Sequence, residues 1–379
     1  FSKIAAMISR RALFKTAAVG AAAAATSSFP TDLFSWTEPQ RVFQPGGPIL
    51  LNSNENAYGP LPSVLRVPNP FMNANRYPDH SVDLLKQALA RQHKVGADQV
   101  VLGCGSTEIL RMAAAAFTGP ARKMVTATPT FEAIGSYAEA GKATVIKVPL
   151  VIESFAHNVP AMAREAAKGG GLVYICNPNN PTGSLTPRRT LENFIRDLPK
   201  NVYVLIDEAY HDFVPVSADY ISFLDTPVND DRVIVARTFS KIYGMAGLRL
   251  GYGIASPQTA KLLSQQKLDD SANEFALRCA LASLADTRGH ELAITRNAND
   301  RAAFMEEAKT RKIPAIISWT NFVMINCMRP VKEVIEHLKQ NNILIGRPFP
   351  PMDMWARISL GTPVQMKAFW EVWDKMPKA

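Results

Sequence analysis

Val233-Ile-Val-Ala-Arg-Thr-Phe-Ser-Lys241-Ile-Tyr-Gly-Met-Ala-Gly-Leu-Arg249-Leu-Gly-Tyr-Gly253 is the stretch on which the fold prediction depends. An apolar run leads into a turn with a single lysine, Lys241, and Arg249 follows eight positions later. Burying an ammonium group costs free energy and lowers its pKa, and such a lysine is a nucleophile toward aldehydes. The stretch therefore predicts a buried strand, a catalytic turn and an anion-binding arginine. The alternative is a surface lysine on a loop.

Short apolar runs alternate with helical patterns on both sides of this stretch. The predicted strands are 100–102, 124–127, 144–148, 172–176, 203–206, 233–236 and 250–254. The predicted helices are 81–93, with Ser81 as N-cap, 107–117, 131–140 and 190–197. Apolar strands separated by helices are typical of a parallel sheet covered on both faces. We therefore predict an α/β fold with a mostly parallel, seven-stranded sheet.

The last third of the chain has a different pattern. Residues 261–306 predict two long amphipathic helices that connect two lobes, and the rest predicts a smaller α+β lobe. Before the sheet, the chain from 29 to 48 is rich in proline and extended. We expect four parts: a terminal segment 1–28, an arm 29–73 packing with the small lobe, a large domain 74–285 and a small domain 286–379.

Composition excludes several classes of protein. The formal charge is +9, but four of the positive charges precede residue 16, and no basic stripe interleaved with aromatics follows, which argues against nucleic-acid binding. The four cysteines are widely spaced without a Cys-x-x-Cys pattern, which argues against a zinc site or a disulfide framework.

The first 28 residues predict a targeting segment. Arg10 and Arg11 precede an uncharged, alanine-rich run from Thr16 to Ala25 that is too short to span a bilayer. This arrangement resembles a twin-arginine export signal and predicts a periplasmic protein without a membrane span. The alternative is an alanine-rich helix of a cytoplasmic protein.

Three polar segments follow predicted strands, and ligands of such sheets bind beyond the carboxyl ends of the strands. Gly103-Cys-Gly-Ser-Thr-Glu108 opens a helix, where free N–H groups suit a phosphate. Asn177-Pro-Asn-Asn-Pro-Thr-Gly183 presents amide side chains from a backbone fixed by prolines. Asp207-Glu-Ala-Tyr210 places a carboxylate after an apolar run, which is costly unless a cation pairs with it. Together with Lys241, these groups indicate pyridoxal 5'-phosphate.

These blocks resemble the fold-type I pyridoxal-phosphate aminotransferases of class I/II. The segments 51–60, 76–79 and 357–362 are similar to the histidinol-phosphate aminotransferase branch, and the resemblance covers nearly everything from residue 50 onward. It implies an aspartate-aminotransferase-like large domain and a homodimer. Ala57 and the pair Ile242-Tyr243 depart from the family pattern and leave the substrate open.

The resemblance implies a role for each cofactor residue. Lys241 would bind the cofactor as a Schiff base and move the substrate's α-proton, and Asp207 would keep the ring nitrogen protonated. Asn177 and Tyr210 would contact the ring's phenolic oxygen, and Phe131 would stack on the ring. The cofactor phosphate would be held by Gly105, Ser106, Thr107, Ser240 and Arg249, and by Tyr77 across the dimer interface.

The resemblance also implies the substrate contacts and the reaction. Arg357 would bind a substrate carboxylate in a bidentate pair, and Asn56, Tyr58, Tyr243 and Arg347 are further candidates for the substrate pocket. The expected reaction is ping-pong amino transfer between an amino acid or histidinol phosphate and a 2-oxo acid. The alternatives are an aromatic or other amino acid aminotransferase and an amino acid decarboxylase using the same cofactor. A non-enzymatic binding protein is disfavoured because the lysine and the aspartate are both present.

Overall fold

The computed structural model describes residues 47–68, 73–217 and 219–377. The predicted twin-arginine segment and about half of the predicted arm, residues 29–46 and 69–72, lie outside the described residues. Within them, no helix is both long enough and apolar enough to cross a membrane.

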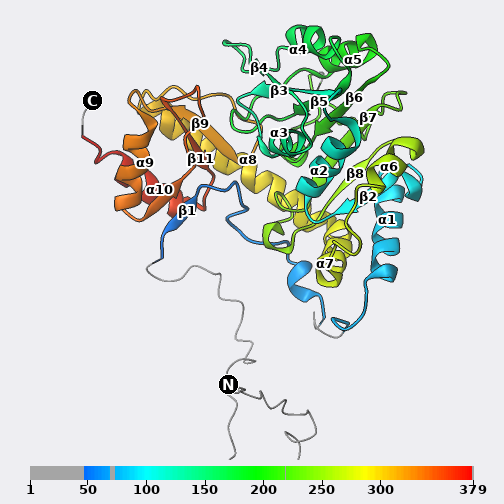
Figure 1. Ribbon diagram of the computed structural model, residues 1–379. Helices are drawn as coiled ribbons and strands as arrows, with labels where there is room; N and C mark the ends of the chain where they lie inside the picture. The colour runs from blue at the N-terminus through cyan, green and yellow to red at the C-terminus, as the bar shows by residue number, and fades with distance from the viewer. Residues whose placement is uncertain (1–46, 69–72, 218, 378–379) are drawn as a thin grey trace, which may run out of the picture. The chain divides into compact units, whose positions relative to one another are not determined.

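A seven-stranded sheet dominates the described chain (Figure 1). Its strand order is β2-β8-β7-β6-β5-β3-β4, and only β8 runs antiparallel to its neighbours. The strands are β2 (Val100–Gly103), β3 (Lys123–Thr128), β4 (Val145–Pro149), β5 (Gly171–Cys176), β6 (Val202–Asp207), β7 (Val233–Thr238) and β8 (Gly251–Ile254). Each predicted strand is present within two residues of its expected ends, which confirms the predicted fold class.

Helices cover both faces of this sheet, because successive strand residues point to opposite faces. In β5, Val173 and Ile175 join the core beneath one set of helices, whereas Leu172 and Tyr174 join the core beneath the other. The first set is α1 (Asp79–His93), α4 (Val159–Ala166), α5 (Arg188–Asp197) and α7 (Glu274–Ala285). The second is α2 (Ser106–Phe117), α3 (Ala133–Ala140) and α6 (Pro257–Ser264).

Two helix predictions were wrong in detail. Ser81 is not an N-cap, since α1 begins two residues earlier, after Pro78, with Asp79 in its first turn. The region 261–306 holds parts of three helices, because polar caps divide it. Asn273 accepts a hydrogen bond from Ala276 N at the start of α7, and Asp286 accepts one from Gly289 N at the start of α8 (Thr287–Thr310). The short helix α4 was not predicted.

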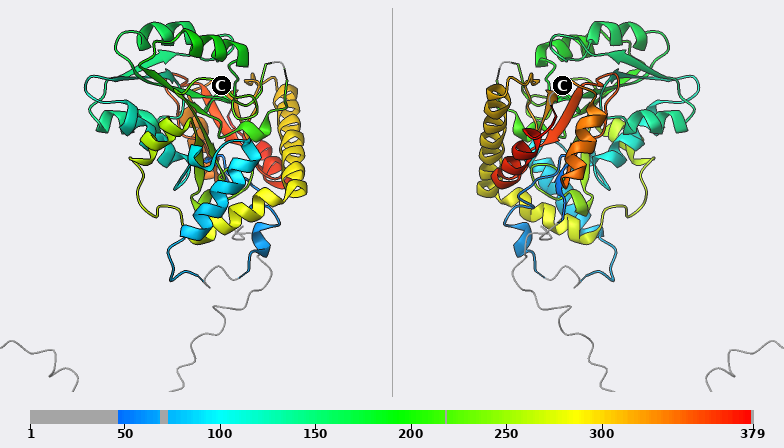
Figure 2. Two further views of the ribbon diagram at one scale, coloured as in Figure 1. Left: turned by 90° about the vertical axis from the view of Figure 1, so that its right-hand side faces the viewer. Right: turned by 90° about the vertical axis from the view of Figure 1, so that its left-hand side faces the viewer.

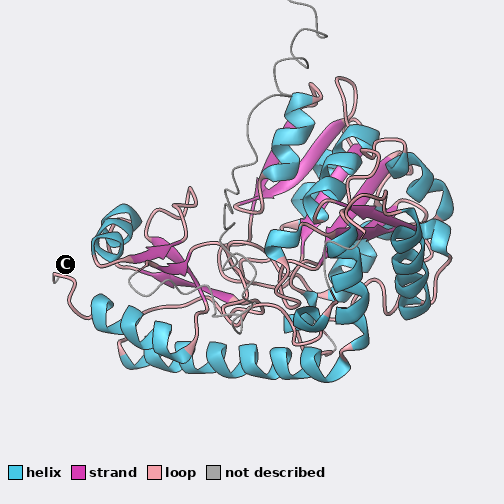
Figure 3. Ribbon diagram, turned by 90° about the horizontal axis from the view of Figure 1, so that it is seen from below, coloured by secondary structure: helices cyan, strands magenta, loops and turns pink. Residues whose placement is uncertain are grey.

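Two small sheets complete the fold. β9 (Phe322–Asn326) pairs antiparallel with β11 (Trp355–Ser359), and β1 (Ile49–Leu51) pairs parallel with β10 (Ile343–Ile345). They share a core with α9 (Val331–Gln340), α10 (Pro363–Trp373) and the C-terminal half of α8. The long helix α8 reaches from the helices beside the large sheet to this second core (Figures 2 and 3). The predicted domain boundaries remain predictions.

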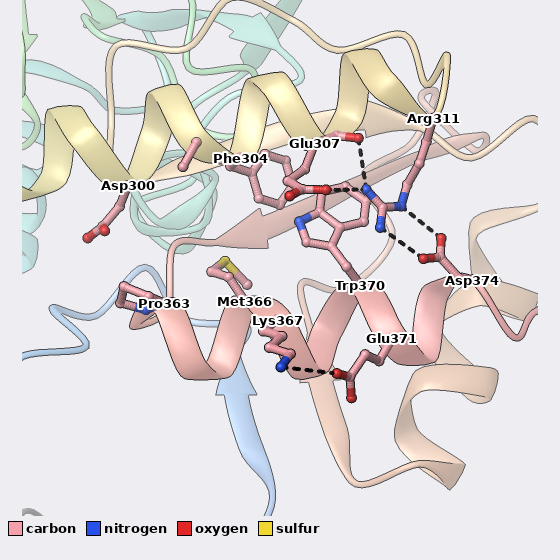
Figure 4. A pocket seen from close by; sticks show the side chains of 11 residues that line it. Asp300, Phe304, Glu307, Arg311, Pro363, Met366, Lys367, Trp370, Glu371 and Asp374 are labelled. Carbon is pink, nitrogen blue, oxygen red and sulfur yellow. Dashed lines mark hydrogen bonds and ion pairs between the residues drawn. The ribbon is translucent and has the colours of Figure 1, made fainter.

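A pocket of about 290 Å³ lies between α8 and α10 (Figure 4). Arg311 crosses it, donating from Nε and Nη2 to the carboxylate of Asp374 at 2.7 and 2.8 Å and pairing with Glu307. Both basic side chains of the lining, Arg311 and Lys367, are thus paired with acidic ones, although the lining holds four acidic and two basic residues. None of the predicted site residues lines it, and we assign it a structural role in joining the two helices.

Candidate active site

The predicted cofactor residues meet at the carboxyl ends of the parallel strands. Asp207 is the last residue of β6 and lies beside Cys176 of β5 and Ala236 of β7 in the sheet register. Lys241 follows the last residue of β7 by three positions. In the same way, α2 begins three positions after Gly103, the last residue of β2, and β2 pairs with β8. The parallel register thus brings together groups that are far apart in the sequence.

Lys241 lies in a setting that favours its neutral amine. Its Nζ donates to the backbone carbonyls of Asn54 at 3.1 Å and Ser53 at 3.4 Å. Burial, with the positive charge of Arg357 as a smaller cause, lowers the pKa of Lys241 to about 8. A larger fraction of unprotonated amine is therefore available near neutral pH than an ordinary lysine would supply.

Asp207 is buried at 3% exposure and has two hydrogen-bond donors. Tyr174 Oη donates to its Oδ2 at 2.8 Å, and the Ala209 backbone N–H donates to its Oδ1 at 3.1 Å. Burial raises the pKa of Asp207 and the two hydrogen bonds lower it, and the effect of burial is the larger, so the pKa is raised to about 6. Such a carboxylate is stabilised by a nearby cation such as a protonated ring nitrogen. Tyr174 was not predicted, although a tyrosine inside an aliphatic strand is a signal that could have identified it.

A phosphate-sized anion has matching donors at the start of α2. Gly105 has φ +76°, and a Cβ there would lie 2.3 Å from Arg249 Nη2, so the position requires glycine. No side chain caps α2, which leaves its first N–H groups, including those of Ser106 and Thr107, for a ligand. Arg249 Nη1 also donates to Ser240 Oγ at 3.2 Å. All five phosphate residues predicted within one chain are therefore brought together, and they fit pyridoxal phosphate.

A buried polar network joins the ring site to the substrate arginine. Tyr210 Oη accepts hydrogen bonds from Asn54 Nδ2 at 3.0 Å and from Asn180 Nδ2 at 3.4 Å. Asn180 Oδ1 in turn accepts from Arg357 Nη1 at 2.7 Å. Burial raises the pKa of Tyr210 well above its usual range, so its hydroxyl remains protonated and can donate to a ligand. Neither Asn54 nor Asn180 was among the predicted residues.

Asn177 is engaged elsewhere. Its Nδ2 donates to the Thr186 carbonyl at 3.1 Å, and its Oδ1 accepts from the Thr186 N–H at 2.9 Å. Both polar atoms thus brace the loop that follows β5. Asn180, three residues later in the same motif, is the asparagine that lies beside Tyr210. The predicted contact of Asn177 with the ring oxygen therefore stays a prediction, without support from its position.

Arg357 is prepared to bind an anion. It is 8% exposed, and its Nη2 donates to the Asn52 carbonyl at 2.6 Å. Its Nε is buried and has no hydrogen-bond partner, although unpaired buried donors are costly. Burial lowers the pKa of Arg357 to about 10. An incoming carboxylate would satisfy both the free donor and the charge.

The remaining predicted residues have identifiable neighbours, but their proposed ligand contacts stay predictions. Asn56 Nδ2 donates to the Ile242 carbonyl at 3.0 Å. The Tyr243 ring stacks on His290 with centroids 5.2 Å apart.

The other four predicted residues are Tyr58, Arg347, Phe131 and Tyr77. Tyr58 Oη donates to Asp300 Oδ2 at 2.9 Å, and Arg347 pairs with Glu132. Phe131 is partly buried against the core beneath α2 and α3, whereas Tyr77 is 78% exposed. No cluster of His, Cys, Asp or Glu among the described residues could hold a metal ion.

Comparison with known proteins places this geometry in context. The family described as aminotransferase class I and II matches residues 47–372. A histidinol-phosphate aminotransferase of Symbiobacterium thermophilum is 33% identical over 326 residues, covering 85% of this chain and 89% of the relative. An aromatic amino acid aminotransferase of Rhodococcus erythropolis is 38% identical over 240 residues, covering 63% and 66%. The crystal structure of the histidinol-phosphate aminotransferase of Sinorhizobium meliloti in complex with pyridoxal-5'-phosphate has a TM-score of 0.80 and 25% identity, covering 87% of this chain and 91% of that one.

Proposed function

The chain belongs to the class I and II aminotransferases as a pyridoxal-phosphate-dependent transaminase of the histidinol-phosphate aminotransferase type, and we propose that Lys241, Asp207 and Arg357 carry its reaction. The observation that supports this most strongly is the position of Lys241. Its amine, whose pKa is lowered to about 8, lies at the end of the same sheet as the buried carboxylate of Asp207. Arg357, a buried guanidinium with a free donor on β11 of a second sheet, contributes to the lowered pKa.

Each of these residues has a separate task in this proposal. Bound pyridoxal phosphate supplies an aldehyde for amine exchange and a ring that accepts the electron pair released at the substrate's α-carbon. The Lys241 amine would hold the cofactor covalently, and it would take the proton from the substrate's α-carbon and return it. The Asp207 carboxylate holds a proton on the ring nitrogen. Tyr210 and Asn180 donate to the ring's phenolic oxygen.

Arg249, Ser240 and the first N–H groups of α2 bind the cofactor phosphate in this proposal. Arg357 would bind the anionic group of the substrate in a bidentate pair, either the α-carboxylate of an amino acid or the phosphate of histidinol phosphate, and this contact would orient the α-proton toward Lys241. A carboxylate held by a guanidinium is retained, so this contact favours amino transfer over decarboxylation. The product of the first half of the cycle then leaves, and a 2-oxo acid enters to accept the amino group.

The names of the relatives support two candidate amino donors. Histidinol phosphate is the leading amino donor, because it is the substrate named for several relatives that are 31 to 33% identical to this chain. Aromatic amino acids are the second candidate, because the relative named for them is 38% identical over a shorter region.

A half-reaction screen separates these candidates. The cofactor-loaded protein is mixed with histidinol phosphate, phenylalanine, tyrosine, aspartate or glutamate in turn, and cofactor absorbance reports conversion from the aldehyde to the amine form. Fast conversion with histidinol phosphate supports the leading assignment. Indifference to histidinol phosphate, with fast conversion by aromatic donors, would reject it. No conversion by any donor, or full conversion by Lys241→Ala, would contradict amino transfer through Lys241.

We also propose that the protein is a homodimer and is exported by the twin-arginine route. The high exposure of Tyr77 suits a residue that completes a partner's phosphate site, and a monomeric mass in analytical ultracentrifugation would oppose the dimer. The sequence around Arg10 and Arg11 supports export. Retention of the full chain in the cytoplasm of a host with a working twin-arginine pathway would oppose it.

A further inference from the structure

A second arginine, Arg347, lies close to Arg357. The Gly346 N–H donates to the Arg357 carbonyl at 3.0 Å, and a Cβ at Gly346 would lie 2.8 Å from that oxygen. This close backbone approach brings the following residue, Arg347, to the strand that carries Arg357. The ring of Phe349 then contacts both guanidinium groups, with Cζ of Arg347 at 4.5 Å and Cζ of Arg357 at 4.8 Å from its centroid.

Arg347 pairs with a carboxylate from the segment between β3 and α3. Glu132 follows the predicted ring-stacking residue Phe131 and directly precedes α3, beyond the carboxyl end of β3. Its Oε2 accepts a hydrogen bond from Arg347 Nη2 at 2.5 Å. The pair therefore connects the loop after β3 to the loop between β10 and β11. Contacts continue from Arg347 through Phe349, Arg357 and Asn180 to Tyr210.

The pair is exposed and can therefore exchange partners. The side chains of Arg347 and Glu132 are 54% and 60% exposed, and ion pairs of this kind contribute little to stability because water screens them. A substrate with an uncharged side chain leaves the pair intact. A substrate with a second negative group must either displace Glu132 from Arg347 or lie close to the Glu132 carboxylate, and both reduce its binding.

We propose that Glu132 is a specificity-determining residue: by occupying Arg347 it disfavours substrates that carry a second anionic group and favours those with an uncharged side chain. This inference rests on the proposed aminotransferase function, and it assigns a substrate class to the same site. Glu132 acts through Arg347 and takes no part in proton transfer.

The test is the ratio of kcat/KM for L-glutamate to that for L-phenylalanine, measured in the amino-donor half-reaction of the cofactor-loaded protein. Glu132→Gln keeps the shape and a hydrogen-bond acceptor but removes the charge. It should raise the glutamate-to-phenylalanine ratio by about 5-fold, the range of an exposed ion pair. Histidinol phosphate has a single anionic group, so its ratio to phenylalanine should change less than that of glutamate. In an Arg347→Gln background, Glu132→Gln should no longer raise the glutamate-to-phenylalanine ratio.

A matched control uses another exposed ion pair. Glu165 pairs with Lys168 at 2.7 Å near the end of α4, so Glu165→Gln removes one negative charge from the surface and should leave the ratio unchanged. An equal shift in Glu165→Gln would mean that net charge alone explains the effect. An unchanged ratio in Glu132→Gln, or the same rise without Arg347, would overturn the inference while leaving the aminotransferase function intact. A wild-type protein inert to every donor would instead refute the function itself.

Discussion

Replacing Asp207 by asparagine should stabilise the cofactor-free protein at neutral pH while abolishing its amino transfer. Burial raises the pKa of Asp207 from 3.8 to about 6. One pKa unit corresponds to about 1.4 kcal/mol, so an ionised Asp207 costs the folded protein about 3 kcal/mol at pH 7. Asparagine carries no charge, and its amide oxygen can still accept from the Ala209 N–H. The gain should therefore be up to about 3 kcal/mol.

The direction of the pKa shift determines how the free energy of unfolding changes with pH. The unfolded chain releases the proton near pH 4 and the folded protein near pH 6, so the folded state binds more protons between these values. The contribution of Asp207 to wild-type stability therefore falls as the pH rises from about 4 to about 6 and is constant above that range. The advantage of Asp207→Asn should be close to zero at the lower limit and complete above the upper one.

Urea unfolding of both cofactor-free proteins, followed by circular dichroism at pH 4.5 and pH 7.5 and at equal protein concentration, measures this difference. The urea concentration at the unfolding midpoint should be higher for the variant than for the wild type, mainly at pH 7.5. Adding pyridoxal phosphate should reverse the order, because only the wild type pairs a carboxylate with the protonated ring. A variant that is less stable at pH 7.5, or equally shifted at both pH values, would show that the buried charge does not carry this cost.

Two further predictions concern the phosphate and ring sites. Gly105→Ala should weaken cofactor binding by about 10-fold or more in an absorbance titration, because the backbone conformation is restricted to glycine and its Cβ would lie 2.3 Å from a guanidinium nitrogen. Gly247→Ala, whose Cβ would meet nothing within 4 Å, is the control, and equal losses would oppose the phosphate assignment. Asn180→Ala should change the cofactor's absorbance and lower kcat/KM. Asn177→Ala should instead lower the unfolding free energy by about 1–3 kcal/mol, and the reverse pattern would return the ring contact to Asn177.

The sequence was sufficient to predict the sheet, and it also predicted that Asp207 and Lys241 lie at the ends of its strands. Central strands of a parallel sheet are buried on both faces, so they are read directly as apolar runs. Asp207 and Lys241 stand out for the same reason, since a charge at the end of such a run is costly without a ligand. The N-caps of α7 and α8 were not predicted from the sequence, because Asn273 and Asp286 lie within one long amphipathic pattern.

The choice between Asn177 and Asn180 could not be made from the sequence. Both lie in one loop with two prolines, and their residue type is identical. Only the path of the backbone turns one amide toward Thr186 and the other toward Tyr210. The contribution of Asn54 is similarly hidden, because its side chain reaches Tyr210 across 156 residues of sequence and its φ of +54° is a tertiary property.

The three groups assigned to the reaction share one electrostatic property. Burial shifts the pKa of Lys241 down to about 8, that of Arg357 down to about 10 and that of Asp207 up to about 6, so each shift opposes the charged form. A substrate carboxylate offers Arg357 the opposite charge, and a protonated ring nitrogen does the same for Asp207. Covalent attachment removes the need to protonate Lys241. The unfavourable free energy of burying these charged groups is thus offset when cofactor and substrate bind. Removing one of these charges should therefore stabilise the cofactor-free fold and abolish the reaction.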